Sequence, residues 1–289
     1  MRRINNNKSV KVIPVSAGYF HCDGGALFSV IPKKLWSKVY PADKDNFTRL
    51  ALRCLYVETG KHKIIIESGI GNHFSDKHYK NNGYTPGNYL LNSLAALNIC
   101  TNDITDVVFT HLHWDHCTGA VVNEGGSYRL LFPNANHWCS KTQWNHSFTS
   151  NAREKVAFHK KVLDFLNNSG KLHLVEKEGE LFPAINIRFF NGHTPGQIIP
   201  FIKVENFTVV YTSDLIPTAA NIPLLWLASY DLYPVEALEE KEKFLDEASA
   251  NSYVLLFEHD YFTECATVKK DEKGFRAAQL FNWSALFAR

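Results

Sequence analysis

The sequence lacks three features that would each place it in a particular class of protein. Its six cysteines are scattered without a Cys-x-x-Cys pair, which argues against a structural zinc knuckle, a thioredoxin-like site and a disulfide framework. It has no long run of like charge, and 31 Lys and Arg against 29 Asp and Glu leave a net charge of +2, so no extended nucleic-acid-binding surface is expected. No apolar run reaches the roughly eighteen residues of a membrane span, and the N-terminus has no signal-like apolar stretch. We therefore expect a cytoplasmic protein with reduced thiols and with no nucleic-acid or membrane partner.

The chain also lacks internal repeats, low-complexity tracts and linkers rich in Pro, Gly or Ser. Hydrophobic residues make up 45% of the chain and charged residues 21%, close to the composition of globular proteins. A chain of 289 residues is long enough for one large domain with a sizeable core. We expect a single domain that spans residues 1–289.

Short apolar runs rich in β-branched and aromatic residues alternate with helical patterns. The apolar runs predict strands at Ala51–Val57, Lys63–Ile66, Asp106–Thr110, Ile185–Phe190, Ile198–Val204, Phe207–Tyr211 and Tyr253–Phe257. Apolar residues at helical spacing predict helices at Tyr89–Leu97, Arg153–Leu166 and Pro234–Ala248. Tight turns are expected at Glu58–Lys61 and at Glu205-Asn206, and residues 267–283 fit a strand pair or a short helix. Mixed sheets flanked by helices follow from this order.

The segment after the third predicted strand is the most informative part of the sequence. It holds three imidazoles and one carboxylate within six positions: His111, His113, Asp115 and His116. Neutral imidazole and ionised carboxylate are suitable ligands for zinc, iron, nickel or manganese. On an extended stretch His111 and His113 point the same way, whereas Asp115 and His116 lie beyond the turn of the loop. The segment can therefore contribute ligands to two metals.

Four ligands on one loop cannot complete two coordination spheres, so further ligands are expected at later strand ends. His193, Asp214 and His259 each follow a predicted strand, and Gly192 and Gly196 allow the backbone to bend around His193. Taken singly, each of the three is more often an ordinary loop residue, and the whole set carries the metal hypothesis. The histidines outside this set are expected at the surface or at helix ends, and Cys22 and Cys117 are expected to be packed thiols.

The pattern His-x-His-x-Asp-His, followed by His, Asp and His in that order, resembles the metallo-β-lactamase superfamily of hydrolases from about residue 50 to 260. The resemblance implies a four-layer αββα sandwich of two mixed β-sheets flanked by helices, with the metals in a shallow cleft at one edge. It assigns the seven ligands as follows: one metal is held by His111, His113 and His193, the other by Asp115, His116 and His259, and Asp214 bridges both together with a hydroxide. Glu67 replaces the Asp that ends an earlier strand in the family. Glu67 and Thr110 are expected beside the ligands.

The segment from Asp23 to Trp36 is similar to one in the lactonase-like branch, which also includes phosphotriester-cleaving enzymes. The resemblance suggests a substrate pocket near the metals, with a wall lined by Phe20, Phe28 and Trp36. Trp226 and Tyr230 belong to an aromatic cluster between Asp214 and the next predicted helix; they are first expected to pack in the core, with a place at the substrate pocket as the alternative. Lactonases of this branch place a Tyr three residues after the bridging Asp, and here that residue is Pro217.

The resemblance implies a dinuclear hydrolase in which the bridging hydroxide attacks a small ester and Asp115 carries a proton to the leaving group. Lactones such as N-acyl homoserine lactones are the first substrate hypothesis. A phosphotriester, a glyoxalase II-like thioester or a non-catalytic metal- and ligand-binding sensor domain are the alternatives. Two divalent ions are expected, zinc first, with iron, manganese, cobalt or nickel as alternatives. A homodimer is common in this branch.

Overall fold

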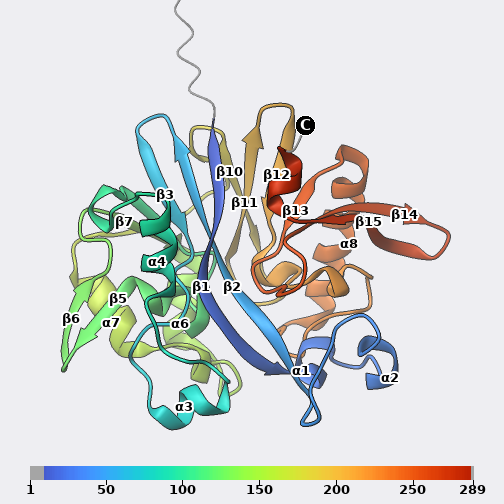
Figure 1. Cartoon of the computed structure of the whole chain (residues 1–289), viewed down its shortest axis with the longest axis horizontal. Coiled ribbons are helices and arrows are strands. Elements are labelled where there is room, and N and C mark those ends of the chain that lie inside the picture. The colour runs from blue at the N-terminus through green and yellow to red at the C-terminus, as the bar shows by residue number, and fades with distance from the viewer. Residues whose placement is uncertain (1–9, 288–289) are drawn as a thin grey trace, which may run out of the picture.

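The computed structural model describes residues 10–287, and the N-terminal stretch that is expected to lack a signal sequence lies partly outside this range. Two large β-sheets pack against each other at the centre of the molecule, with helices on either side (Figure 1). The first sheet contains, in spatial order, β1 (Lys11–Asp23), β2 (Phe47–Thr59), β3 (His62–Ile66), β4 (Asp106–Val108), β7 (Asn136–Ser140) and β8 (Leu172–Val175). Its first three strands are antiparallel, and β3, β4, β7 and β8 are parallel.

The second sheet is antiparallel except for one parallel pair, β12 with β13. Its spatial order is β15 (Gly274–Phe281), β14 (Cys265–Asp271), β13 (Val254–Leu256), β12 (Phe207–Tyr211), β11 (Gln197–Val204), β10 (Ile185–Phe190) and β9 (Gly179–Phe182). A separate hairpin pairs β5 (Val121–Glu124) with β6 (Ser127–Leu130).

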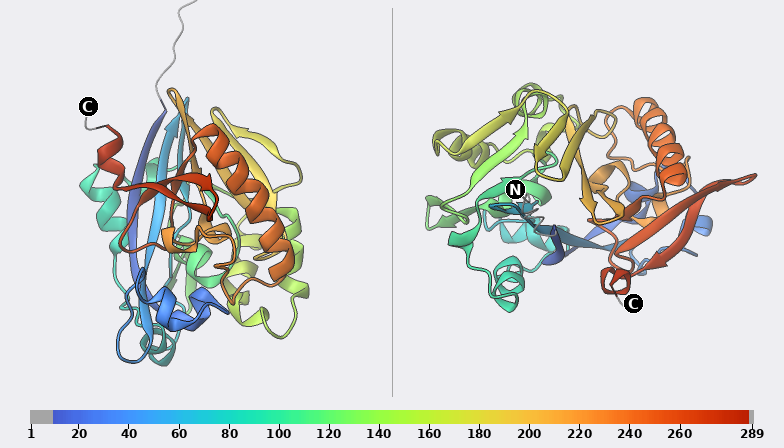
Figure 2. Two further views of the ribbon diagram at one scale, coloured as in Figure 1. Left: turned by 90° about the vertical axis from the view of Figure 1, so that its right-hand side faces the viewer. Right: turned by 90° about the horizontal axis from the view of Figure 1, so that it is seen from above.

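The helices are short except for the last. They are α1 (Gly24–Phe28), α2 (Lys33–Trp36), α3 (Asp76–Asn81), α4 (Tyr89–Ala96), α5 (Trp114–Cys117), α6 (Lys141–Thr149), α7 (Lys160–Asn168) and α8 (Pro234–Asn251). Single 3₁₀ turns are η1 (Thr101–Asp103), η2 (Thr118–Ala120), η3 (Lys155–Ala157), η4 (Ser213–Leu215), η5 (Ala219–Asn221) and η6 (Trp283–Leu286). Helix α8 runs along the outer side of the second sheet (Figure 2). None of the helices within residues 10–287 is long and apolar enough to cross a membrane.

The alternation of side chains along β2 explains the four layers. Leu52 and Tyr56 pack in a cluster with side chains of α4 and α7, whereas Leu55 and Val57 pack against strands of the second sheet. Because neighbouring residues of a strand face opposite sides, a strand that is apolar on both faces must be covered on both. On the far side of the second sheet, a third cluster joins β11 and β12 to Phe244 and Leu245 of α8. The predicted αββα sandwich is confirmed.

The strands predicted from apolar runs are all present, although β4 and β13 are shorter than expected and β2 is longer. The hairpin turn after Thr59 and the turn at Glu205-Asn206 are confirmed, and residues 267–283 contain paired strands. Strand β1 was not predicted, because its register shifts between Ser16 and Tyr19 and so its apolar alternation breaks there. Gly18 lies at this irregularity with φ of +105°.

The helix predicted at Arg153–Leu166 begins later, at Lys160. The side-chain oxygen of Asn151 accepts hydrogen bonds from the backbone N–H groups of Arg153 (2.9 Å) and Glu154 (3.2 Å), which folds this stretch into a turn. The Nδ1 atom of His159 accepts from the N–H of Val162 and caps the helix. Residues 151–159 therefore form an irregular segment.

Backbone hydrogen bonds join the two sheets at one edge. The N–H of Ala51 donates to the carbonyl of His259 (2.9 Å), and the N–H of Ile198 donates to the carbonyl of Thr110 (2.7 Å). The guanidinium of the buried Arg53 donates to the carbonyls of Phe257 and Asp260, which flank His259 in the chain. The predicted ligand segments of both sheets are thus held at the same edge.

Candidate metal centre

The seven predicted ligands come from five segments that meet at this edge. His111 and His113 lie on the extended chain after β4, and Asp115 and His116 lie on α5. The other three ligands follow strands of the second sheet: His193 follows β10, Asp214 lies in η4 after β12, and His259 follows β13. The structure brings all seven side chains together.

Asp214 occupies the centre of the cluster. Its Oδ2 lies 3.1 Å from Nε2 of His193, 3.6 Å from Nε2 of His111 and 3.4 Å from Nε2 of His116. Its Oδ1 lies 3.1 Å from Nε2 of His259. Asp214 therefore contacts imidazoles from both predicted ligand sets, as a bridging carboxylate must.

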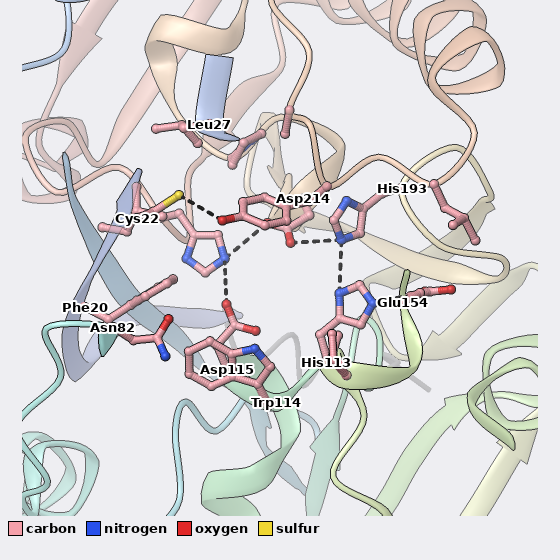
Figure 3. Close-up of a pocket in the computed structure, with 18 of the residues that line it drawn as sticks. Phe20, Cys22, Leu27, Asn82, His113, Trp114, Asp115, Glu154, His193 and Asp214 are labelled. Carbon is pink, nitrogen blue, oxygen red and sulfur yellow. Dashed lines mark hydrogen bonds and ion pairs between the residues drawn. The ribbon is translucent and has the colours of Figure 1, made fainter. Parts of the chain in front are cut away.

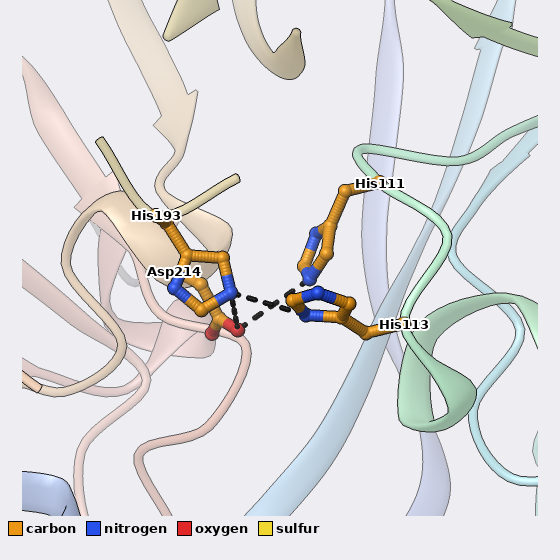
Figure 4. Close-up of side chains that lie close together, drawn as sticks. All are labelled: His111, His113, His193 and Asp214. Carbon is orange, nitrogen blue, oxygen red and sulfur yellow. Dashed lines mark hydrogen bonds and ion pairs between the residues drawn. The ribbon is translucent and has the colours of Figure 1, made fainter. Parts of the chain in front are cut away.

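The potential ligand atoms fall into two main groups. His111, His113, His193 and Asp214 form one, in which the four ligand atoms lie within 4.8 Å of one another (Figure 4). Asp115, His116 and His259 form the other within the same limit. A third combination, of Glu67 with His111 and His116, overlaps both.

The electrostatics of the cluster suit a bound cation. Nε2 of His111 is buried without a hydrogen-bond partner among residues 10–287, and Nδ1 of His113 lies only 3.2 Å from Nε2 of His193. Burial and the neighbouring imidazoles hold the pKa of His111 well below its usual value. Burial would also lower the pKa of His193 and His259, but Asp214 outweighs it and raises them to about 10 and about 9. Nitrogen lone pairs that converge beside a carboxylate fit a divalent metal.

The second nitrogen of each imidazole contacts a group of the protein. The distances are 3.0 Å from His111 Nδ1 to Thr110 Oγ1, 3.1 Å from His113 Nε2 to Glu154 Oε1, 3.0 Å from His193 Nδ1 to Asp231 Oδ1, 3.2 Å from His116 Nδ1 to Glu258 Oε2 and 2.9 Å from His259 Nδ1 to the Ala51 carbonyl. Such contacts fix the ring orientation and leave the other nitrogen free for a metal.

Sequence reasoning missed three of these partners. Glu258 is adjacent to a predicted ligand, and this adjacency was the only signal for it. Glu154 and Asp231 lie in irregular segments far from the histidines they contact, so no spacing pattern indicates them.

Glu67 lies buried beside the predicted ligands. Its Oε1 accepts the backbone N–H of Thr110 at 2.7 Å and lies 3.7 Å from Nδ1 of His116, whereas Glu258 approaches that nitrogen more closely. Burial, together with the nearby charge of Glu258, raises the pKa of Glu67 to about 7. The backbone of Glu67 has a φ of 66°, an uncommon conformation that clusters at functional sites. Glu67 thus holds the chain that leads into His111.

A cavity of about 250 Å³ opens onto the cluster (Figure 3). Its base includes His113, Asp115, His193, Asp214 and His259. Apolar walls come mainly from Phe20, Leu27, Leu50, Trp114, Val156 and Leu232, and polar groups from Arg153 and Tyr230. Pro217 also lines the cavity.

Of the five residues named for a substrate pocket, Phe20 and Tyr230 line the cavity, and Phe28, Trp36 and Trp226 do not. Phe28 stacks on Trp36 with ring centroids 5.2 Å apart and meets Trp226 edge-on at 5.8 Å. Gly24 leaves room for this packing, because a Cβ there would lie 2.2 Å from the Trp36 ring. These three aromatic residues therefore belong to the packing behind the cavity wall.

Cys22 also lines the cavity, and its Sγ lies 3.4 Å from the hydroxyl of Tyr230. Burial raises the pKa of the Cys22 thiol to about 12. The thiol therefore stays protonated at neutral pH and is no nucleophile.

Comparison with known proteins agrees with this geometry. A family model described as the metallo-beta-lactamase superfamily matches residues 49–122. The crystal structure of a probable metal-dependent hydrolase from Staphylococcus aureus is 31% identical, with a TM-score of 0.86, over 94% of this chain and 96% of that one. The chain belongs to the metallo-β-lactamase superfamily.

Two further structures of this superfamily fold are similar at lower identity. AidC, a dizinc quorum-quenching lactonase in complex with a homoserine product, has a TM-score of 0.77 at 22% identity, over 94% of this chain and 96% of that one. The hydrolase AbOPH has a TM-score of 0.73 at 19% identity, over 95% and 96%. No curated protein sequence matches the chain. As a metallo-β-lactamase superfamily member, the protein is a hydrolytic enzyme of a family that uses divalent metal ions, which confirms the expected enzyme class.

Proposed function

We propose that this superfamily member uses two divalent metal ions to hydrolyse a small neutral ester, and that the ester is a lactone of the N-acyl homoserine type. The observation that carries the proposal is the arrangement around Asp214. Five imidazoles each turn one nitrogen toward a shared centre while the other nitrogen contacts the protein, and Asp214 contacts members of both ligand sets.

The donor set fits two ions. His111, His113 and His193 would hold one, Asp115, His116 and His259 the other, and Asp214 would contact both. Zinc suits this mixture of nitrogen and oxygen ligands, and iron, manganese, cobalt or nickel are the alternatives. When bound, such ions would lower the pKa of a bound water to about 7 and polarise the carbonyl of an ester.

The chain itself supplies proton transfer and exclusion of water. Asp115 lines the cavity, and its Oδ2 lies 3.7 Å from Nε2 of His116 and 3.8 Å from Nε2 of His259. A carboxylate there would be within reach of both the attacking water and the leaving oxygen of a bound ester, and we assign it the transfer of the proton that the water loses to that oxygen. Phe20 and Trp114 cover the side of the cavity next to Asp115 and restrict access of bulk water.

The walls of the cavity support a substrate with an apolar acyl group. A volume of about 250 Å³ suits a small molecule, and most of its lining residues are apolar. The fold similarity to AidC, a lactonase crystallised with its N-acyl homoserine product, supports the same substrate class. We further propose a single domain, with a homodimer as its assembly.

Metal titration and a substrate panel test this proposal. We expect two equivalents of zinc per chain, and kcat/KM values for N-acyl homoserine lactones at least tenfold above those for aryl phosphotriesters and glutathione thioesters. One equivalent would contradict the dinuclear centre. Preference for a phosphotriester or thioester would contradict the substrate class while leaving the hydrolase intact.

A further inference from the structure

Lys241 lies in the middle of the buried face of α8. That face consists of Ala237, Lys241, Phe244, Leu245 and Ala248, and the Lys241 side chain is only 1% exposed. Burial lowers its pKa to about 7, which reflects the cost of removing an ammonium from water. A lysine is kept at such a position only where its donors have specific partners.

The partners of Lys241 are three carbonyls of a single loop. Its Nζ donates to the carbonyls of Pro223 at 3.0 Å, Leu224 at 3.3 Å and Trp226 at 3.0 Å. An ammonium has three N–H donors, so these contacts use all of them. Lys241 therefore joins α8 to residues 223–226, which have little regular structure of their own.

The same loop shapes the cavity and supports one predicted ligand. Asp231 accepts from Nδ1 of His193 at 3.0 Å, and the N–H of Leu232 donates to the carbonyl of His193 at 3.0 Å. Ala228 and Tyr230 line the cavity. The path of residues 223–232 thus decides both the orientation of His193 and one wall of the cavity.

Few other hydrogen bonds hold residues 223–226, although Leu224 and Trp226 also pack against apolar side chains. The side-chain amide of Asn221 donates to the carbonyl of Trp226 at 3.2 Å, a carbonyl that Lys241 also contacts. An apolar side chain in place of Lys241 could fill the same volume but would leave the carbonyl of Leu224 without its donor. The carbonyls of Pro223 and Trp226 would each keep one donor, the N–H of Trp226 and the side-chain amide of Asn221.

We propose that Lys241 is a positioning residue that fixes residues 223–232 and, through Asp231, the orientation of His193. The inference rests on the proposed function only in taking His193 as a metal ligand. It predicts that loss of the ammonium loosens the loop and weakens one metal site while the core of α8 stays packed.

Hydrogen exchange and zinc titration of Lys241→Met test the inference, with Lys243→Met as the control because Lys243 is exposed on the same helix. In Lys241→Met we expect exchange of residues 223–232 to be at least tenfold faster, with exchange in β11 and β12 unchanged. Affinity for one zinc equivalent should fall by about tenfold. Lys243→Met should match the wild type in both measurements.

Lys241→Gln keeps two N–H donors and should give intermediate values, which covers the case in which Lys241→Met does not fold. Unchanged exchange in the loop of either folded variant would overturn the inference. Neither readout depends on turnover, so failure of the lactonase proposal leaves this test intact.

Discussion

The two halves of the candidate metal centre are supported in different ways. In the half formed by His111, His113 and His193, the carboxylates behind two imidazoles come from irregular segments: Glu154 lies between α6 and α7, and Asp231 precedes α8. In the half formed by Asp115, His116 and His259, the supporting groups lie on strands or directly after them.

The difference extends to the cavity. The segment that carries Glu154 also contributes Arg153 and Val156 to the cavity wall, and the loop that carries Asp231 contributes Tyr230. Arg153 joins the two segments, because its guanidinium donates to the carbonyls of Ser229 and Asp231. By contrast, Glu258 and the carbonyl of Ala51 are held by the pairing of the two sheets. One half of the centre is held by the paired sheets, and the other by loops that also line the cavity.

Removing the residue common to both halves should have the largest effect. In Asp214→Ala we expect kcat/KM to fall by about a thousandfold or more, which is roughly 4 kcal/mol of transition-state stabilisation, and both zinc equivalents to bind more weakly. Asp246→Ala is the control, since Asp246 is exposed on α8. Tight binding of both ions in Asp214→Ala would contradict the shared role of this carboxylate.

The two kinds of support also explain what the sequence could predict. Strands are recognisable in the sequence as apolar runs, and the candidate ligands follow them. The convergence of His111, His193 and His259 on one sheet edge could therefore be predicted from their positions after these runs. The period of two also put His111 and His113 on one side of an extended chain.

The supporting carboxylates were not predictable in the same way. Glu154 reaches His113 because Asn151 folds the preceding residues into a turn, and apolar spacing alone predicted a helix there instead. Strand β1 was missed because a bulge interrupts its alternation. The sequence pattern thus indicated candidate ligands for both halves but none of the three carboxylates that contact them.

Replacing the supporting carboxylates one at a time should separate the halves. We expect Glu154→Gln and Asp231→Asn each to weaken one zinc equivalent by about 10- to 100-fold, and Glu258→Gln to weaken the other by a similar factor. Burial opposes ionisation of Glu154, but hydrogen bonds from His113 and Thr194 lower its pKa to about 2, so it is an ionised acceptor at neutral pH.

Competition with a chelator measures the two affinities separately, and Glu242→Gln on the exposed face of α8 is the control. Equal weakening of both ions by Glu154→Gln would contradict the assignment of separate supports. A double substitution of Glu154 and Glu258 should weaken both equivalents.

The response to pH should be shared by the halves, since the pKa is raised for His193 in one half and for His116 and His259 in the other. His193 and His259, with pKa values of about 10 and about 9, are protonated at pH 8 in the metal-free protein. A histidine whose pKa is higher in the folded state stabilises the protein below its unfolded pKa of about 6.5, and this stability is lost as pH rises through the folded pKa.

The Tm of the metal-free protein should therefore fall between pH 6.5 and pH 10, by at least about 2 °C, because 1 kcal/mol shifts Tm by roughly 2–4 °C at this size. Zinc requires neutral imidazoles, so the added stability from zinc should rise over the same range, and loading at pH 8 should release protons. Thermal melts at pH 6.5 and pH 10, with and without zinc, measure these changes in Tm. An equal change in Tm with and without zinc would count against the histidine cluster as the zinc-binding site.

The smallest expected effect concerns the cavity wall beside the half formed by His111, His113 and His193. Tyr230 precedes Asp231, and its hydroxyl lies at the cavity, 3.4 Å from Sγ of Cys22. In Tyr230→Phe the ring remains, and we expect KM for a lactone to rise about two- to tenfold, the range for loss of one hydrogen bond, with kcat nearly unchanged. Cys22→Ala serves as the control, because it removes the sulfur neighbour and keeps the hydroxyl. Zinc affinity should be unchanged in Tyr230→Phe, since the contact between Asp231 and His193 is kept. Weaker zinc binding by Tyr230→Phe would mean that the cavity wall at Tyr230 and the support of His193 by Asp231 depend on each other.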